Sequence, residues 1–414
     1  MSDPLPAKQS AGLVLALLLL AYIFNFLDRQ ILGILGPSIQ ADLNLSDSQF
    51  GAIGGTAFAL LYASLGIPLA YLADKKSRSA VVAGSLAVWS AFTALCSLAA
   101  GYWSLFVFRL GVGVGEAGGV APSYALISDY FPEERRALAL AIFSLGIPLG
   151  LGGGSFVGAR LAHWFGWRAA FAIMGLVGLV LAPVLRLIVR DLPKKAMVQS
   201  RLSGAFPMVA HNPAFWLLAF ASSASSLCGY GLALWTPKVM MLSFGLDLVS
   251  TGNFLASLLL IGGCAGVFAG GWFADRLGST DKSWYAKLPA IAWLISVPAW
   301  GLGFFAPNLW IAWPLLLVGS AVNILWLGPV VTAVQHLVPQ PMRATASASF
   351  LLINNLIGLG VGPWLMGRLA DAFRADYGTN ALRDAAVVCL GFYGLAALLM
   401  ILSIRSLKAS WVVD

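Results

Sequence analysis

Charged side chains are scarce in this chain of 414 residues, where Asp, Glu, Lys and Arg together make up only 10%. Soluble globular domains carry about 25%. Hydrophobic residues make up 59% of the chain, and apolar stretches of about 20 residues recur along it, as bilayer-spanning helices require. The composition therefore excludes an ordinary soluble protein and predicts a polytopic membrane protein.

Metal-binding and redox motifs are also absent from the sequence. It has four cysteines and three histidines, no CxxC pair and no histidine cluster. The cysteines all fall inside apolar stretches, which is typical of small packing residues. The absence of a P-loop argues against an ATP-driven pump, and the glycine-rich GVGVGE lies inside an expected helix rather than after a strand. We expect no cofactor, no metal site and no enzymatic activity.

No cleavable signal peptide is expected, because MSDPLPAKQSAG is short and polar and leads directly into a full-length span. The net charge is +8, but most of the Lys and Arg fall in loops on one side of the expected membrane, among them Lys8, Lys75, Arg135, Lys194 and Arg201. By the positive-inside rule this side is cytoplasmic. We expect a bacterial inner-membrane protein with both termini in the cytoplasm and no nucleic-acid partner.

Twelve spans are expected from the apolar runs. They cover residues 11–39, 48–73, 79–99, 102–130, 135–160, 168–189, 213–241, 249–275, 285–305, 309–337, 343–370 and 384–405. Most connections are short, but the segment around residues 190–212 is long, basic and polar. We predict an all-α polytopic membrane protein with twelve transmembrane helices in two six-helix halves: residues 1–189, a cytoplasmic linker at 190–212, and residues 213–414.

A repeated motif supports the division into halves. AYLADKKSR, with Asp74, closes the second expected helix, and GWFADRLGS, with Asp275, closes the eighth. Both place Ala-Asp followed by a basic residue at the cytoplasmic end of the second helix of a half. Parallel repeats of this kind relate the two halves of some secondary transporters.

The polar residues within the first and fourth spans are the candidate coupling site. Asn25, Asp28 and Arg29 have the spacing i, i+3, i+4 and share one helix face. Arg109 and Glu116 are seven residues apart, about 10 Å along a helix axis, and also share a face. Each charge costs roughly 2.5–3.5 kcal/mol near the bilayer centre. Both faces should therefore point into the protein or a water-filled cavity.

Proton coupling is the function that we predict for these charges. Loss of water disfavours a charged carboxylate, whereas a neighbouring arginine favours it. Protonation of Asp28 or Glu116 would release Arg29 or Arg109 and bias one access state over the other. A static ion network that holds the first and fourth helices together is the alternative.

The second half has no charged side chain near the midpoint of a span and offers aromatic and amide groups instead. A charged half that faces an apolar half suits an amphipathic substrate with a polar head and an acyl tail, and the guanidinium of Arg29 matches a phosphate or carboxylate. Packing against lipid or other helices is the alternative for each aromatic residue. The predicted substrate-binding residues are Asn25, Arg29, Glu116, Tyr230, Trp235, Asn323 and Trp326.

These motifs resemble those of major facilitator superfamily transporters over nearly the full length. ADKKSR and ADRLGS are similar to the family's loop motif, typically GxLaDrxGr, although Ala70 and Ser77 replace its two glycines in the first copy. Arg109 with Gly115 resembles the fourth-helix motif, and GIPLGLGGG resembles the Gly/Pro motif of the fifth helix. Within the superfamily, Asn25-x-x-Asp28-Arg29, RLGVGVGEAG and APSYALISDYFPEERR resemble the spinster-like lipid transporters.

This resemblance implies a proton-coupled transporter of a lysophospholipid or sphingolipid-like lipid that works by alternating access. We expect the protein to be a monomer. The anion:cation symporters of organic acids also carry Asp-Arg in helix one and Gly-x-x-Glu-Ala in helix four. A proton-coupled organic-anion or sugar-acid symporter is therefore the alternative.

The family's arrangement also implies a cytoplasmic gate of ion pairs that holds the helix ends together when the protein faces outward. Exposed pairs contribute only about 0–1 kcal/mol each, so a network is needed. A role as topology signals only is the alternative. The predicted gate residues are Asp74, Lys75, Arg78, Asp129, Arg135, Arg136, Asp275, Arg276 and Arg343.

Overall fold

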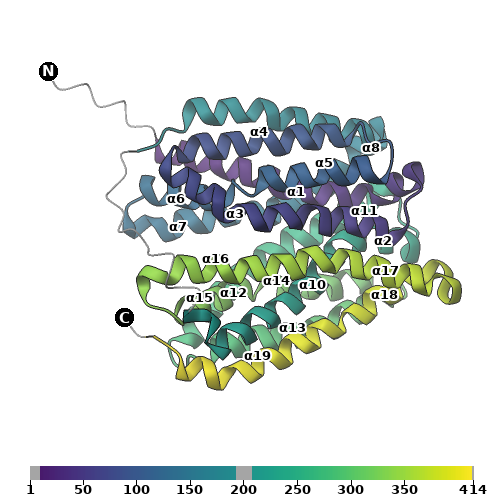
Figure 1. Ribbon diagram of the computed structural model, residues 1–414. Coiled ribbons are helices and arrows are strands. Elements are labelled where there is room, and N and C mark those ends of the chain that lie inside the picture. Colours follow the sequence, from purple (N-terminus) through teal and green to yellow (C-terminus); the bar gives the residue numbers. More distant parts are fainter. Residues whose placement is uncertain (1–9, 193–207, 413–414) are drawn as a thin grey trace.

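Figure 1 shows the computed structural model of the protein, in which residues 10–192 and 208–412 are described. These two stretches are helical and contain no β-strand. The helices form two bundles that lie side by side, with α1 to α8 in one half and α10 to α19 in the other (Figure 1).

Between residues 10 and 192, the first half contains nine helical segments. They are α1 (Ala11–Leu43), α2 (Asp47–Ala52), η1 (Ile53–Ala57), α3 (Phe58–Lys75), α4 (Arg78–Cys96), α5 (Tyr102–Glu116), α6 (Val120–Tyr130), α7 (Glu133–Ser144) and α8 (Gly146–Ile188). The second half begins at residue 213. It contains α10 (Pro213–Phe244), α11 (Leu248–Ser257), η2 (Leu258–Gly262), α12 (Gly263–Gly278), α13 (Trp284–Phe304), α14 (Leu309–Ile324), α15 (Leu327–Gln335), η3 (Gln340–Met342), α16 (Arg343–Asn354), η4 (Asn355–Leu359), α17 (Gly360–Tyr377), η5 (Gly378–Asn380), α18 (Ala381–Cys389) and α19 (Gly391–Ala409).

Ten continuous helical runs in the described ranges are long and apolar enough to cross a membrane. Two of them, 134–188 and 345–409, contain 55 and 65 residues. At 1.5 Å per residue these runs would each extend about 80–100 Å, more than twice the thickness of a bilayer. Each turns back once, at Gly166 (φ 81°) and at Gly378 (φ 54°), where the left-handed backbone favours glycine. The fold is therefore the predicted one, with twelve membrane-spanning helices.

Three spans in the described part of the chain contain a π-helical turn within an otherwise α-helical run. These turns are η1 in the second span, η2 in the eighth and η4 in the eleventh. A π-helical turn holds one extra residue within an α-helix and often lies at a functional site. In all three spans the α-helix continues without a break on both sides of the turn.

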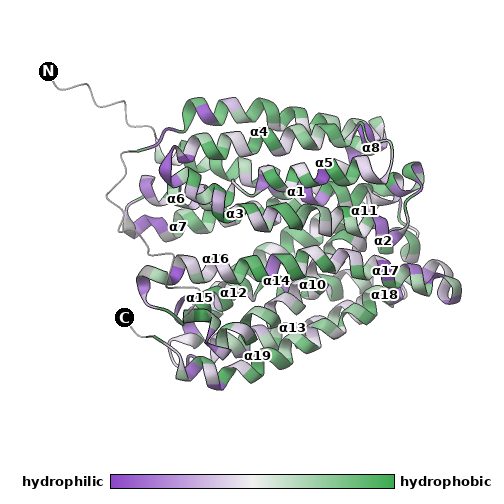
Figure 2. Ribbon diagram, in the orientation of Figure 1, coloured by the Kyte–Doolittle hydropathy of each residue, from purple (hydrophilic) through white to green (hydrophobic). Residues whose placement is uncertain are grey.

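Figure 2 shows that hydrophobic residues cover the middle of the bundles and that hydrophilic residues gather toward the two ends. We name these ends by one residue each. The Asp47 end holds the turns near residues 44–47, 97–101, 166, 245–247 and 378, and the Arg78 end holds those near residues 76–77, 131–132, 279–283 and 336–342. Ser10, which precedes α1, also lies at the Arg78 end, as does Val412, whose N–H donates to the carbonyl of His336 at 2.7 Å.

The linker predicted at residues 190–212 is described only at its edges. Lys194, Lys195 and Arg201, like Lys8, lie outside the described residues. The boundaries 1–189, 190–212 and 213–414 therefore stay predictions.

Candidate functional site

A buried ion pair joins two helices near the middle of the first half. The Nε of Arg29, on α1, donates to Oε2 of Glu116, on α5, at 2.7 Å. The Glu116 side chain is fully buried, and the Arg29 side chain is 13% exposed. The structure thus brings together two of the charges that the sequence predicts to act in coupling.

Aromatic rings surround the guanidinium of Arg29. Its Cζ lies 5.0 Å from the ring centre of Phe26 and 4.7 Å from those of Phe58 and Tyr62. Rings at this distance attract a cation through their quadrupole. Arg29 therefore has favourable contacts that do not depend on the charge of Glu116.

Asp28 lies next to this pair in the sequence but has a different partner. The hydroxyl of Thr93, on α4, donates to Oδ2 of Asp28, while Oδ1 has no hydrogen-bond partner among the described residues. A cavity of about 10 Å³ lies beside Asp28 and Thr93, which is close to the smallest volume that holds one water. Asp28 is therefore directed toward α4 rather than toward Glu116.

Arg109 and Asn25 are buried, and each has side-chain polar atoms that form no hydrogen bond with the described residues. Arg109 is 1% exposed and lies 5.4 Å from the ring centre of Phe58. Its Nε and Nη1, and both amide atoms of Asn25, have no hydrogen-bond partner among the described residues. Buried polar groups are normally paired, and an unpaired one costs about 1–3 kcal/mol. A purely structural network would satisfy these groups, so their free capacity suits a site that changes partners.

The substrate-binding residues predicted in the second half lie in two places. Tyr230 is partly buried against apolar side chains of the first half. Asn323 accepts a hydrogen bond from the Tyr393 hydroxyl at 2.7 Å, and Trp326 packs against Trp293 with ring centres 6.3 Å apart. Their contact with a substrate stays a prediction.

Trp235 lies further away, at the Asp47 end, where it is 1% exposed. Its indole N–H donates to the carbonyl oxygen of Pro363 at 2.8 Å, and its ring meets that of Phe50 edge-on. In this conformation Trp235 joins the two halves.

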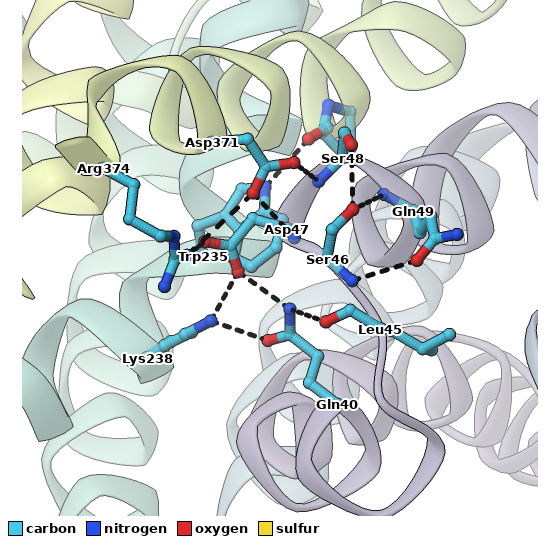
Figure 3. A network of polar contacts seen from close by, with 11 residues as sticks. Gln40, Leu45, Ser46, Asp47, Ser48, Gln49, Trp235, Lys238, Asp371 and Arg374 are labelled. Carbon is cyan, nitrogen blue, oxygen red and sulfur yellow. Dashed lines mark hydrogen bonds and ion pairs between the residues drawn. The ribbon is translucent and has the colours of Figure 1, made fainter.

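A network of charged and polar side chains joins the two halves at the Asp47 end, as Figure 3 shows. We call Gln40, Asp47, Lys238, Asp371 and Arg374 the Asp47 cluster. The carboxylate of Asp47 has no exposed surface and binds both Lys238 and Arg374 of the other half. Gln40 donates to Asp47 Oδ1 at 2.8 Å and accepts from Lys238 Nζ at 2.9 Å. The cluster therefore holds α1 and α2 against α10 and α17.

The start of α2 is capped from the opposite half. The carboxylate of Asp371, on α17, accepts from the backbone N–H groups of Asp47 at 3.1 Å and Ser48 at 2.8 Å (Figure 3). A helix N-terminus favours a negative charge. Glycine permits this approach, because a Cβ on Gly51 or Gly367 would lie 2.3 Å from a backbone oxygen of the other half.

The predicted gate residues of the first half form contacts within that half at the Arg78 end. Arg78 binds Asp74 at 2.9 Å and Asp129, on α6, at 2.5 Å. Lys75 lies over the ring of Tyr71, and Arg136 donates to the carbonyl of Ser128 at 3.1 Å. Arg135 is exposed.

In the second half, Arg276 lies 5.3 Å from the ring centre of Trp272, and Arg343 donates to the carbonyl of Gln335 at 3.2 Å. Asp275 is exposed. The role of both sets of residues as a gate stays a prediction.

Comparison with known proteins identifies the family. Residues 18–363 match the model of the Major Facilitator Superfamily. The chain belongs to this superfamily. It is 33% identical to an MFS-type efflux pump of Mycolicibacterium smegmatis, over 91% of this chain and 89% of that protein. It is therefore a transporter embedded in a membrane and not an enzyme.

Two further relatives in the superfamily bear on the substrate. The chain is 27% identical to protein spinster homolog 1 of Homo sapiens, over 90% of this chain and 76% of that protein. It is 26% identical to a hexuronate transporter of Bacillus subtilis, over 95% of this chain and 94% of that protein.

A solved structure matches the whole chain. It is a bacterial homologue of the human lysosomal transporter spinster, in an inward-facing and unoccupied conformation, with a TM-score of 0.89 and 27% identity. The match covers all of both chains. The resemblance to spinster-like transporters is thus confirmed.

The sequence interpretation of this transporter missed the Asp47 cluster. Its members lie at or near span ends, where single polar or charged residues are common and carry no pattern. One signal was available, since the Ser46-x-x-Gln49 capping box places Asp47 in the first turn of α2. Counting spans then puts Lys238 and Arg374 at the same end with the opposite charge.

Proposed function

We propose that the protein is a proton-coupled secondary active transporter of an amphipathic lipid, of the lysophospholipid or sphingolipid-like class, that works by alternating access. The observation that carries the proposal is the Arg29–Glu116 ion pair, buried in mid-membrane among aromatic rings. An ion pair in such a place carries a high free-energy cost of moving its charges out of water. Use in coupling explains why the chain keeps it.

Protonation of Glu116 is the proposed switch. The neutral carboxyl no longer attracts the guanidinium of Arg29 by charge. The rings of Phe58 and Tyr62 still hold the guanidinium in place. Arg29 Nε is then available to another acceptor, such as the phosphate or carboxylate of a substrate. Asp28 is the second proton-binding group, and Arg109 is the buried cation that adjusts both carboxylates.

The Arg78 end is the proposed cytoplasmic end, because the basic loops gather there. The Asp47 cluster then closes the protein toward the outside, and the described conformation faces the cytoplasm. The similarity to an inward-facing structure supports this assignment. In the opposite conformation, the gate residues around Arg78 and Arg343 would hold the cytoplasmic ends together.

An amphipathic lipid is the proposed substrate for two reasons. The first is the resemblance to spinster-like lipid transporters, which the spinster relatives support. The second is the contrast between a charged first half and a second half with Tyr230, Asn323 and Trp326 but without a charge near mid-span. A head group would bind near Arg29 and the tail along the second half.

A hexuronate or another organic anion is the second candidate. The relative named as a hexuronate transporter favours it, and a sugar acid would offer Arg29 the same carboxylate. The two candidates differ in their apolar tail.

Transport into liposomes tests both proposals. The purified protein is reconstituted, a pH gradient is imposed, and uptake and proton flux are measured with a lysophospholipid and with a hexuronate. We expect proton flux with the lysophospholipid and none in Glu116→Gln liposomes. Flux driven only by the hexuronate would replace the lipid by an organic anion. Transport without proton movement would overturn the coupling.

A further inference from the structure

A groove crosses the boundary between the two halves on the outer surface of the spans. Its volume is about 420 Å³, within the range of 300–1,000 Å³ typical of ligand pockets. Its walls come from the second span, from α5 and from the eleventh span. The main wall residues are Thr56, Leu60, Tyr102, Phe106, Val361 and Trp364.

The groove offers apolar surface. Its lining includes no charged side chain, and the hydroxyl of Thr56 is already used, because it donates to the carbonyl of Gly360 at 2.8 Å. Leu60, Val361 and Trp364 are 52%, 36% and 40% exposed on the outer face of the bundle. In a membrane this exposed surface meets lipid tails, so the ligand must be apolar and come from the bilayer.

The position of the groove selects one leaflet. Its wall on the second span runs from Ala52 to Leu60, about 12 Å along a helix axis. It begins five residues after Asp47, the first residue of α2. One leaflet contributes about 15 Å of the hydrocarbon core. The groove therefore follows the acyl region of the leaflet at the Asp47 end.

We propose that this groove binds an acyl chain of a bilayer phospholipid, and that it does so only while the Asp47 end is closed. Thr56 and Leu60 move with the first half, whereas Val361 and Trp364 move with the second. Opening the Asp47 end would separate the walls and break the Thr56–Gly360 hydrogen bond. A ligand that binds one conformation shifts the population toward it. The lipid thus stabilises the conformation described here, whatever the transported substrate is.

Cross-linking in liposomes tests the proposal. The full chain is reconstituted with a phosphatidylcholine that carries a diazirine on its acyl chain, irradiated and mapped by mass spectrometry. We expect adducts concentrated on peptides that contain Ala52–Leu60 and Leu356–Trp364. Val361→Phe, which fills the groove from an exposed position, should lower these adducts at least fivefold. Leu356→Phe is a second filling variant, and Leu398→Phe, on the exposed face of α19, is the matched control.

The dependence on conformation has its own readout. Asp47→Asn weakens the closed end and should lower the groove adducts in proportion to the loss of the closed population. Adducts spread evenly over all lipid-facing helices would overturn binding. Adducts unchanged in Asp47→Asn would overturn the dependence on conformation. Displacement by a lysophospholipid at constant phosphatidylcholine would assign the groove to the transported molecule and also overturn the proposal.

Discussion

Arg29 contacts a carboxylate and three aromatic rings at once, and this combination explains why the position suits arginine. The guanidinium is planar and can bind Glu116 through Nε while its face meets Phe58 and Tyr62. A lysine would keep the charge and lose the stacking. Loss of the Glu116 charge therefore leaves Arg29 in place but able to bind another acceptor.

Glu116→Gln and Asp28→Asn should each reduce transport driven by a pH gradient at least tenfold. Both substitutions keep the size of the side chain and remove the proton-binding group. Uptake into liposomes measures the effect, and size-exclusion chromatography should show a folded protein.

Two matched variants control for the change from acid to amide. Asp42 lies on the same helix as Asp28 but is half-exposed at the Asp47 end, and Glu134 is exposed at the start of α7. The controls are Asp42→Asn and Glu134→Gln. Both should transport normally. Normal transport by Glu116→Gln and Asp28→Asn as well would contradict the proton switch.

Asp191 gives a pH dependence outside the membrane. Burial raises the pKa of Asp191, but hydrogen bonds from the side chain of Ser77 and from Ser79 outweigh it and lower that pKa below its ordinary value. Asp191 therefore stabilises the start of α4 above about pH 4, and the effect is lost as the pH falls through the lowered pKa.

Asp191→Asn should lower the stability of the protein at pH 7 by about 0.5 kcal/mol, at the low end for a helix cap because the residue is exposed. Thermal unfolding in detergent, followed by tryptophan fluorescence, measures the change. The difference from the wild type should shrink below pH 4, and Asp376→Asn, an exposed site, should show none. A difference that persists at pH 2.5 would contradict the assignment.

Sequence reasoning at the residue scale works where a residue is out of place. Arg29 and Glu116 are conspicuous because charge is rare in an apolar run, and helical spacing gives the face on which each lies. Thr93 could not be predicted as the partner of Asp28, because a threonine in a span costs little and is common. Asp47 and Asp371 were missed for the same reason, since charges at span ends are ordinary.

The π-helical turns η1, η2 and η4 are the main feature at the scale of elements. Each lies within a span and contacts the other half, with η1 against α17, η2 against α8 and η4 against α3. Span positions follow from apolar length, and the sequence predicts them well. The π-helical turns could not be predicted, because one extra residue shifts a helical pattern by about 100° and these spans are too uniformly apolar to show such a shift.

Deletion of Ile261 should convert η2 into regular α-helix without reversing the faces of α11 and α12, because a π-helical turn absorbs one inserted residue. The protein should fold but turn over several-fold more slowly, since the eighth span loses the irregular turn that contacts α8 of the other half. Initial transport rates in liposomes measure this. Ile261→Ala keeps the turn and should behave like the wild type, and an unchanged rate after deletion would remove η2 from the transport cycle.

At the scale of the whole molecule, the two halves meet through opposite charges at the Asp47 end. Asp47 alone binds a lysine and an arginine of the other half, and its carboxylate is fully buried. Removing one member of a buried ionic cluster leaves its partners uncompensated. The closed conformation therefore depends strongly on this one residue.

Asp47→Asn should shift the equilibrium toward opening at that end by about 1.4 kcal/mol, or tenfold in the population ratio. Spin labels at Trp103→Cys and Trp310→Cys, exposed on opposite halves at this end, report the distance by double electron–electron resonance. The population with the longer distance between the two spin labels should increase.

Asp42→Asn is the matched control for this experiment, because Asp42 binds Arg168 within the first half at the same end. Its distance distribution should equal that of the wild type. An unchanged distribution in Asp47→Asn would show that apolar contacts between the halves, such as Phe50 against Trp235, keep the end closed without the charge.

The cap that Asp371 places on α2 has a consequence for every turnover. When the halves part, the N–H groups of Asp47 and Ser48 lose their acceptor and must be hydrated. The second span would then begin to unwind from its first residue, except that Ser46 and Gln49 form a cap of their own within the first half. This local cap preserves the start of α2 while the Asp371 carboxylate is separated from it. The backbone amide hydrogens at the start of α2 should therefore exchange with solvent at a rate set by the rate of transport.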